Sequence, residues 1–283
     1  MTIDTIAVVD WSSGNDTGPT PRKDAIWAAA VVDGTSEDPV YLRNRTEAHN
    51  WLTSLIEREH SANRRLMIGF DFPFGYPTGF AKAVTGTDNP LRLWSWMADH
   101  LEDTPKSNSR FDVAGQLNAY FSGTGPFWFN GLKRDIPNLP RKGTARQGHG
   151  MPDRRIAETR AAGTFTCWQM GGAGAVGGQV MTGIAALEHL RRAFPDTIAV
   201  WPFERLDKPV AFVEIWPSLI DPVVREVDDI RDRAQVHLLA LALAHIPPTQ
   251  LDAMLCEGIP HGEEGWILGL GHEALLQACA RRD

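Results

Sequence analysis

Two apolar segments of the chain each end in an aspartate that is followed at once by residues that favour a turn. Asp10 comes near the end of TIAVVDW and is followed by Ser12 and Ser13, whereas Asp71 ends LMIGFD and precedes a proline-rich segment. Short apolar runs bounded by turn residues are typical of buried strands. Carboxylates at the ends of buried strands are candidates for metal binding or for acid-base chemistry.

Two later segments carry further candidate acids. Glu214 lies between apolar neighbours in a predicted strand at 210–217, and Asp229 and Asp232 lie in a predicted helix at 227–245. A spacing of three residues places the two aspartates on one face of that helix.

Carboxylates from separate elements repel one another at short range unless a cation lies among them. Mg²⁺ and Mn²⁺ prefer oxygen ligands, so the pattern predicts a site for Mg²⁺ or Mn²⁺ with Asp10, Asp71 and Asp232 as ligands. These three residues and Glu214, which would assist or orient a water molecule, are the candidate catalytic residues. In the alternative interpretation, the strand-end aspartates cap turns, and Asp232 belongs to a solvated helix face.

The elements that must position these residues alternate in type. Strands are predicted at 5–11, 25–32, 39–43, 66–71, 165–170, 197–203 and 210–217, and helices at 46–59, 90–103, 110–121, 179–194 and 227–245. The pair Asp33-Gly34 favours a tight turn, so the first three strands are expected to form an antiparallel meander. The later alternation predicts an α/β mixed sheet that also contains parallel strands. We expect a single domain over 1–283 with a helical and loop insertion at about 78–162.

A glycine-rich segment at 171–178 lies between a predicted strand and a predicted helix. Such a turn can present backbone N–H groups to an anion at the start of a helix, so Gly174, Gly177 and Gln179 are candidate substrate contacts. Ser12 and Ser13, directly after Asp10, are candidates for the same role. The alternative for the glycines is a tight crossover that needs small residues for close packing.

A long polar loop at 122–152 leads into a stretch rich in Lys and Arg, between 133 and 160. Phe127, Trp128 and Phe129 lie just before the basic residues, and this combination suits phosphate neutralisation together with base stacking. Arg146 and His149 are the candidate substrate-binding residues here. The alternative is a solvated loop that its aromatic residues anchor.

The composition restricts the class of partner. The chain has 283 residues, with 35 acidic and 28 basic side chains and a formal net charge of −7. This balance excludes a protein that coats nucleic acid through bulk charge, but it leaves open a small or locally bound phosphate substrate. Three widely spaced cysteines, the lack of a signal-peptide pattern and the lack of a long apolar run favour the cytoplasm and no membrane association. The oligomeric state is not predicted.

Several motifs together resemble a known family. VVDWSSG, IGFDFPFGYP, GAVGGQVMTGI, VEIWPS, DDIRDRAQVHLLALA and EGWILG are similar to motifs of an uncharacterised bacterial family, domain of unknown function 429. Its members are described as predicted nucleases with a ribonuclease H-like fold. The resemblance implies that fold and the matching positions Asp10, Asp71, Glu214 and Asp232. Arg233 departs from the alanine that the family usually has after its last-helix aspartate.

In many enzymes of this fold an acid on the first helix also binds metal. Glu57 and Glu59 are the candidates at the end of the first predicted helix, and the sequence does not choose between them. The resulting first hypothesis is a metal-dependent phosphodiester hydrolase that acts on a nucleic acid or nucleotide. The alternatives are an ATP-binding phosphotransferase of the actin-like or sugar kinase type, and a non-catalytic module that binds nucleotides or proteins.

Overall fold

The computed structural model describes residues 2–282, whose contacts group into two compact units. Unit 1 is built from the chain up to Asp71, from Leu190–Pro260 and from Trp266 onward. Unit 2 consists of Phe72–His189 and His261–Gly265. The insertion expected at about 78–162 lies inside unit 2, which extends beyond it on both sides.

Unit 1 contains a mixed sheet that, within the described residues, has seven strands. The strands are β1 (Thr5–Asp10), β2 (Ile26–Val32), β3 (Thr35–Ser36), β4 (Val40–Leu42), β5 (Leu66–Phe70), β8 (Ile198–Val200) and β9 (Val210–Glu214). Their order is β3-β2-β1-β5-β9-β8, and β4 pairs with β2. The predicted α/β class with a mixed sheet is therefore confirmed.

The sheet changes from antiparallel to parallel at β1. On one side, β2 is antiparallel to β1, β3 and β4, and the Asp33-Gly34 turn has φ values of 49° and 78° that suit a tight hairpin. On the other side, β1, β5, β9 and β8 are parallel neighbours. Their continuous apolar sequences are typical of parallel strands that are covered on both faces.

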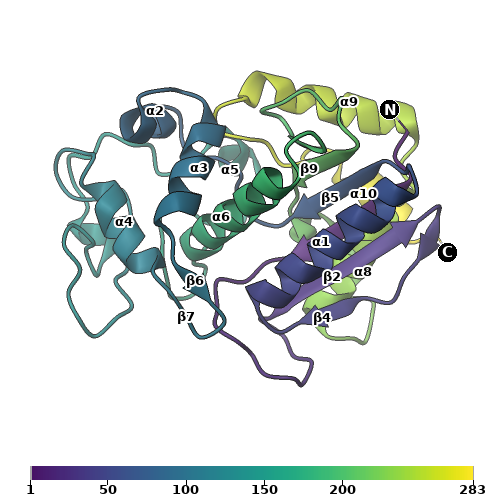
Figure 1. Cartoon of the computed structure of the whole chain (residues 1–283), viewed down its shortest axis with the longest axis horizontal. Coiled ribbons are helices and arrows are strands. Elements are labelled where there is room, and N and C mark those ends of the chain that lie inside the picture. The colour runs from purple at the N-terminus through teal and green to yellow at the C-terminus, as the bar shows by residue number, and fades with distance from the viewer. Residues whose placement is uncertain (1, 283) are drawn as a thin grey trace. The chain divides into compact units, whose positions relative to one another are not determined.

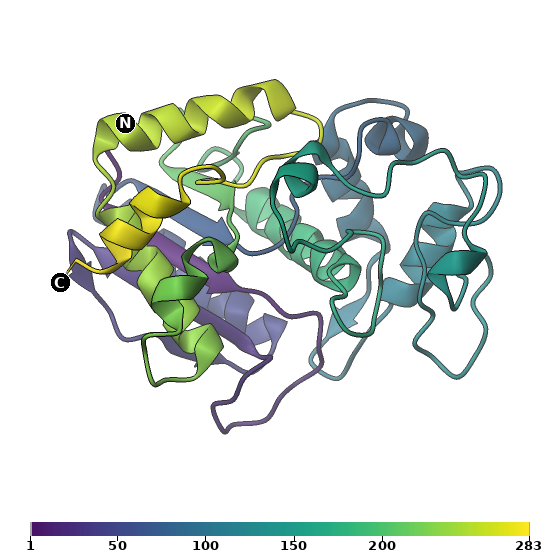
Figure 2. The same ribbon diagram turned by 180° about the vertical axis from the view of Figure 1, so that it is seen from behind.

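Helices cover the two faces of this sheet. Figures 1 and 2 show α1 (Arg45–Ser61) on one face and α8 (Arg231–Ala244) on the other. The side chain of Asn44 caps α1 by accepting a hydrogen bond from the backbone N–H of Glu47. Unit 1 also contains α7 (Asp221–Val224), α9 (Pro248–Gly258) and α10 (Glu273–Ala280).

A buried hydrogen bond identifies which β1 side chains lie on which face. Thr5 Oγ1 donates to Glu59 Oε2 of α1 at 2.6 Å, so Thr5 faces α1. Because side chains alternate along a strand, Ala7 and Val9 share that face, whereas Asp10 lies on the face that α8 covers.

Unit 2 is mainly helical and irregular. Its helices are α2 (Phe80–Thr85), α3 (Pro90–His100), α4 (Arg110–Asn118) and α5 (Ile156–Arg160), and α6 (Gly177–Ala193) leads the chain back to unit 1. A short hairpin pairs β6 (Asp103–Thr104) with β7 (Ser107–Asn108). The predicted helices near 90–103, 110–121 and 179–194 are confirmed.

The predicted strand at 165–170 is wrong. This segment has only an isolated bridge between Gln169 and Trp128. Trp168 is fully buried among aromatic rings instead, at 5.0 to 5.1 Å from the ring centres of Tyr76, Phe80 and Phe127. Aromatic packing rather than strand pairing therefore explains its apolar residues.

The short return segment 261–265 holds distant parts of unit 2 together. The buried Glu264 carboxylate accepts hydrogen bonds from Thr78 N at 2.7 Å, Thr78 Oγ1 at 2.8 Å and Ile156 N at 2.7 Å. Its carbonyl oxygen also accepts from Arg155 Nη1, and Glu263 accepts from Gly79 N.

No single helix in residues 2–282 combines the length and the apolar character needed to cross a bilayer. Only α8 taken together with 248–261, across a bend of 109°, passes on length and composition.

Candidate functional site

The two strand-end aspartates meet at one edge of the unit 1 sheet. Val9 of β1 is in register with Phe70 of β5, so the next residues, Asp10 and Asp71, lie side by side on the α8 face. Their carboxyl groups are hydrogen-bonded to each other. The backbone N–H of Trp11 also donates to Asp71 Oδ1 at 2.6 Å.

Burial raises the pKa of both carboxyl groups, and the charge of Asp71 raises that of Asp10 further. Burial raises the pKa of Asp71 to about 6, although hydrogen bonds from Asp10 and the backbone lower it. Burial, followed by the charge and the hydrogen bond of Asp71, raises the pKa of Asp10 well above its usual range. A hydrogen bond between two carboxyl groups requires one proton, so the pair shares a proton and carries one negative charge fewer than two carboxylates would.

A third predicted ligand joins the pair from α8. Asp232 lies in the first turn of α8, and its charge raises the pKa of both Asp10 and Asp71. Burial, together with the nearby charge of Asp24, raises the pKa of Asp232 itself. Residues that are far apart in the sequence thus form one acidic group, which we call the carboxylate group: Asp10, Asp24, Asp71 and Asp232.

Asp24 is the member that sequence reasoning missed. Its backbone N–H donates to Asp232 Oδ2 at 2.7 Å, and its charge raises the pKa of Asp10. The residue has a φ of 57°, a left-handed conformation that aspartate tolerates better than most residues. The antiparallel pairing of Asp10 with Trp27 brings the start of β2 to the end of β1. The predicted hairpin between the first two strands was therefore sufficient to place Asp24 near Asp10.

A cleft of about 520 Å³ opens beside Asp24 and Asp232. Its other lining residues include three cations, Arg22, Lys23 and Arg231. Arg231 forms an ion pair with Asp221 at 2.9 Å, but Arg22 and Lys23 form no ion pair with any residue that the structure describes. The carboxylate group therefore has positive charge beside it within the same unit.

The fourth predicted catalytic residue lies elsewhere. Glu214 is in register with Phe70, so it shares the face of Phe70 and Val9, opposite to Asp10 and Asp71. The ring contact between Phe70 and Phe212, which lies two residues before Glu214, supports this assignment. The structure thus does not bring the Glu214 side chain to the carboxylate group, because the strand register turns it to the other face.

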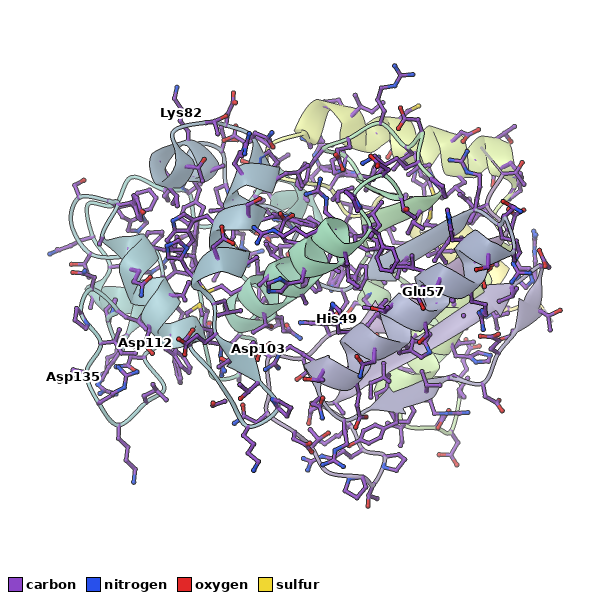
Figure 3. All side chains as sticks on the ribbon, in the orientation of Figure 1. His49, Glu57, Lys82, Asp103, Asp112 and Asp135 are labelled. Atoms are coloured by element: carbon purple, nitrogen blue, oxygen red, sulfur yellow. The ribbon has the colours of Figure 1, made fainter. Side chains whose placement is uncertain are left out.

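Neither first-helix candidate reaches the carboxylate group. Glu59 is fully buried beside Thr5, at the opposite end of β1 from Asp10. Burial by itself raises the pKa of Glu59, but hydrogen bonds from Arg64, Thr5 and Arg58 lower it to about 2, as expected for a structural ion pair. Glu57 is exposed on α1 (Figure 3), the helix that covers the other face.

Ser12 and Ser13 are half-buried in the loop directly after Asp10. The hydroxyl of Ser12 accepts a hydrogen bond from Gly14 N at 3.1 Å. The buried Arg45 donates to the carbonyl oxygens of Ser12 and Gly14, which fixes the start of this loop. Both serines therefore directly follow one member of the carboxylate group, Asp10, within unit 1.

The glycine-rich segment belongs to unit 2, and its glycines are closely packed. A side chain at Gly177, the first residue of α6, would collide with the carbonyl oxygens of Cys167 and Gln169. A side chain at Gly174 would collide with the ring of Phe165. These contacts favour the close-packing interpretation. Gln179 lies half-buried in the first turn of α6 and has an interaction of its own within the chain.

The basic stretch between 133 and 160 also lies in unit 2, and acidic residues neutralise much of it. Arg134 pairs with Asp112 and Arg141 pairs with Asp135, two aspartates that Figure 3 labels. Arg155 is fully buried against Glu158. Fewer of the basic side chains between 133 and 160 are therefore available to a phosphate than their number in the sequence indicates.

Arg146 and His149 also have partners within unit 2. Arg146 pairs with Asp153 at 2.9 Å and lies over the ring of Trp128. The Nδ1 atom of His149 accepts a hydrogen bond from Met151 N at 3.1 Å. Burial and then the charge of Arg146 lower the pKa of His149, so its ring is neutral at pH 7.

As the side chains stand, no three Asp, Glu, His or Cys residues within 2–282 are grouped closely enough to hold one ion. The proton that Asp10 and Asp71 share removes one of the two negative charges whose repulsion a cation would otherwise offset. Oxygen donors from β1, β5 and α8 are the set that a hard divalent ion prefers, so the chemistry of the carboxylate group fits Mg²⁺ or Mn²⁺.

Comparison of the chain with models of protein families, with curated proteins and with solved structures finds no match. The activity of the molecule must therefore be inferred from its residues and their arrangement.

Proposed function

We propose that this protein is a metal-dependent phosphodiester hydrolase of the ribonuclease H-like type, which acts on a nucleic acid or a nucleotide. The observation that carries the proposal is the electrostatic coupling of Asp10, Asp71 and Asp232, which come from three separate elements of unit 1. Burial disfavours ionisation of Asp10 and Asp71, and the charge of Asp232 adds to this effect at both residues. Carboxyl groups whose pKa values are raised in this way are typical of functional sites.

The sheet supports the choice of fold. An antiparallel set of strands joins parallel β5 and β9 at β1, and a late helix returns an aspartate to the end of β1. This arrangement agrees with the resemblance to the predicted nuclease family, in which acids of the first strand and the last helix meet. Glu214 is left out of the proposed site because of its face on β9.

Asp10, Asp71 and Asp232 are the proposed metal ligands, and Asp24 holds Asp232 in place through its backbone N–H. A bound Mg²⁺ or Mn²⁺ would supply activation of water and stabilisation of the leaving oxygen. Trp11 N positions the Asp71 carboxylate by donating to Oδ1. After deprotonation, the three carboxylates would thus provide oxygen ligands that are held in a fixed orientation.

The cleft beside Asp232 supports a phosphate-containing substrate. Arg22 and Lys23 are exposed and without ion-pair partners among the described residues, so they are available to a phosphate. Trp27 Nε1 donates to the carbonyl oxygen of Arg22 at 2.9 Å, which anchors the backbone of this segment. We assign the phosphate grip to these residues in place of the basic stretch at 133–160.

Thermal unfolding with and without metal tests the site. Mg²⁺ or Mn²⁺ at about 100 times its dissociation constant should stabilise the wild-type protein by about 2.7 kcal/mol and raise its melting temperature. Asp10→Asn and Asp232→Asn should abolish this response. Asp228→Asn is the matched control, because Asp228 is an exposed acid four residues before Asp232 that has no part in the carboxylate group.

Hydrolysis of single-stranded oligonucleotides and of a chromogenic phosphodiester, each with Mn²⁺ and with chelator, tests the reaction. Activity should require the metal and be lost in Asp10→Asn but not in Asp228→Asn. If neither ion changes the melting temperature and Asp10→Asn behaves like the control, the metal site is refuted. Stabilisation by ATP but not by oligonucleotides would instead support the phosphotransferase alternative.

A further inference from the structure

A second cavity in unit 1 shares no lining residue with the cleft beside Asp232. It has a volume of about 490 Å³ and lies between the segment after β8 and helix α9. Trp201, Phe203 and Leu206 line it from the segment after β8, and Leu255, Cys256 and Ile259 line it from α9 and the residue that follows. Pockets that bind small molecules have volumes of roughly 300 to 1,000 Å³ and mainly apolar walls.

Close packing fixes the wall of this pocket. The indole of Trp201 is 3% exposed, and its Nε1 donates to the carbonyl oxygen of Leu255 at 2.9 Å. Gly258 lies directly against the indole, where a Cβ atom would collide with the ring. The pocket is therefore preformed, and a ligand would meet little cost of ordering its wall.

The rim leaves apolar surface open to solvent. Ile259 is 66% exposed, the largest exposed fraction among the described large hydrophobic side chains that are exposed. An apolar residue exposed at the mouth of an apolar pocket is a surface that a bound apolar group would cover.

The charges at the pocket favour an anionic head group. Glu204 is already neutralised, because its carboxylate pairs with Arg191 at 3.2 Å and accepts a hydrogen bond from Val200 N at 3.0 Å. Asp252 has an interaction of its own within the chain. Arg205 follows Glu204, is exposed, and forms no ion pair with any described residue. The cation that remains available at the rim is thus Arg205.

We propose that this pocket binds a small amphiphilic acid, whose apolar body lies against Trp201 and Leu255 and whose carboxylate or sulfonate pairs with Arg205. Ligand sites commonly combine mainly apolar walls with a few polar or charged groups that fix the orientation of the ligand. The site is separate from the proposed hydrolase reaction, and its test does not require that reaction.

Cys256 provides a built-in reporter of occupancy. It is exposed and lines the pocket, whereas the other two cysteines, Cys167 and Cys279, are buried. A neutral alkylating reagent such as iodoacetamide should therefore modify Cys256 alone in the folded protein, and Cys256→Ser should remove the signal.

Octanoate is the probe. At about ten times its dissociation constant it should slow the alkylation of Cys256 about tenfold. Octanol and octylamine, which have the same chain length but no negative charge, should protect Cys256 less at equal concentration. Arg205→Gln should weaken the affinity for octanoate about three- to tenfold, the size expected for loss of one partly exposed charge pair.

Arg92→Gln is the matched control, since Arg92 is an exposed arginine of unit 2 without an ion pair among the described residues. It should leave protection by octanoate unchanged. The proposal is overturned if saturating octanoate does not slow alkylation, if octanol protects as well as octanoate, or if Arg205→Gln behaves like Arg92→Gln. All three variants change exposed side chains, so each is expected to fold.

Discussion

At the scale of single residues, the carboxylate group lowers the stability of the fold but provides the groups for the proposed chemistry. Asp10 and Asp71 lie on neighbouring strands where a buried apolar pair would pack without repulsion. Each instead has a raised pKa, which means that the folded state resists the charged form. Because the folded state favours the protonated form, the pH dependence of stability can test the pair without a substrate.

Without divalent metal, the wild-type protein should lose stability as the pH rises from about 4 through 6. The pKa of Asp71 is raised from 3.8 to about 6, so between these values the folded state holds a proton that the unfolded state has released. Such a group stabilises the fold fully below the lower value, and its contribution is lost as the pH rises through the higher one. The loss should be about 2 kcal/mol after allowance for partial solvent access.

Asp71→Asn should remove the part of this pH dependence that Asp71 itself contributes, whereas the part due to the buried Asp10 should remain. At pH 7.5 in chelator the variant should be more stable than the wild type by about 1–2 kcal/mol, as measured by urea denaturation, and it should gain nothing from Mg²⁺. Asp207→Asn, an exposed aspartate of unit 1, should keep the wild-type profile. Equal stability of Asp71→Asn and the wild type across this pH range would contradict the raised pKa.

The sequence predicted that the proposed site contains carboxylates, but it did not predict all of the residues that form it. Asp10, Asp71 and Asp232 were recognisable because each follows or begins an element with a clear apolar pattern. The face on which Glu214 lies could not be predicted, because it depends on the register of β9 with β5, which a single sequence does not contain. Arg22, Lys23 and Asp24 lie in a loop without periodicity, so only the pairing of β1 with β2 reveals them.

At the scale of elements, helix α9 depends on one position without a side chain. Gly258 is the last residue of α9 and lies against Trp201. The indole of Trp201 occupies the space that a side chain at this position would need.

Gly258→Ala should therefore destabilise the protein by about 1–3 kcal/mol, as expected for overpacking, in spite of the better helix propensity of alanine. Chemical denaturation checks the size, and Trp fluorescence should report the displaced indole. Gln250→Ala, at an exposed position of the same helix, should change stability by less than about 0.5 kcal/mol. A gain in stability for Gly258→Ala would mean that propensity outweighs the contact with Trp201.

Elements with strong periodicity were predictable, and irregular ones were not. The helix expected at 46–59 is observed as α1 over Arg45–Ser61, and the strands of the meander lie close to their expected bounds. The segment 165–170 has the composition of a strand, but tertiary packing of Trp168 decided its conformation. The irregular parts of unit 2 could not be predicted, because loops and aromatic contacts rather than periodic elements build them.

At the scale of the whole molecule, the chain passes between the two units four times, at 71/72, 189/190, 260/261 and 265/266. The proposed metal ligands all belong to unit 1, which is assembled from three separate segments. Metal binding should consequently be visible as a local change in a defined subset of the chain.

Hydrogen exchange with and without Mg²⁺ should show protection in three places: the end of β1 with the loop 11–25, the end of β5, and the first turn of α8. The backbone N–H groups of Trp11 and Asp24 already donate to the carboxylate group, so their exchange should respond most. Peptides from 133–160, in unit 2, should not change. Protection in that stretch alone would move the proposed site to the basic loop.

The return segment 261–265 also determines the order in which the molecule can be completed during synthesis. Glu263 and Glu264 bond to Thr78, Gly79 and Ile156, which leave the ribosome long before them. Unit 2 thus lacks these contacts until residues 261–265 have been made, although its other residues, 72–189, are made before them. In a growing chain, its backbone N–H groups at 78, 79 and 156 lack acceptors that lie 108 to 186 residues further along the chain.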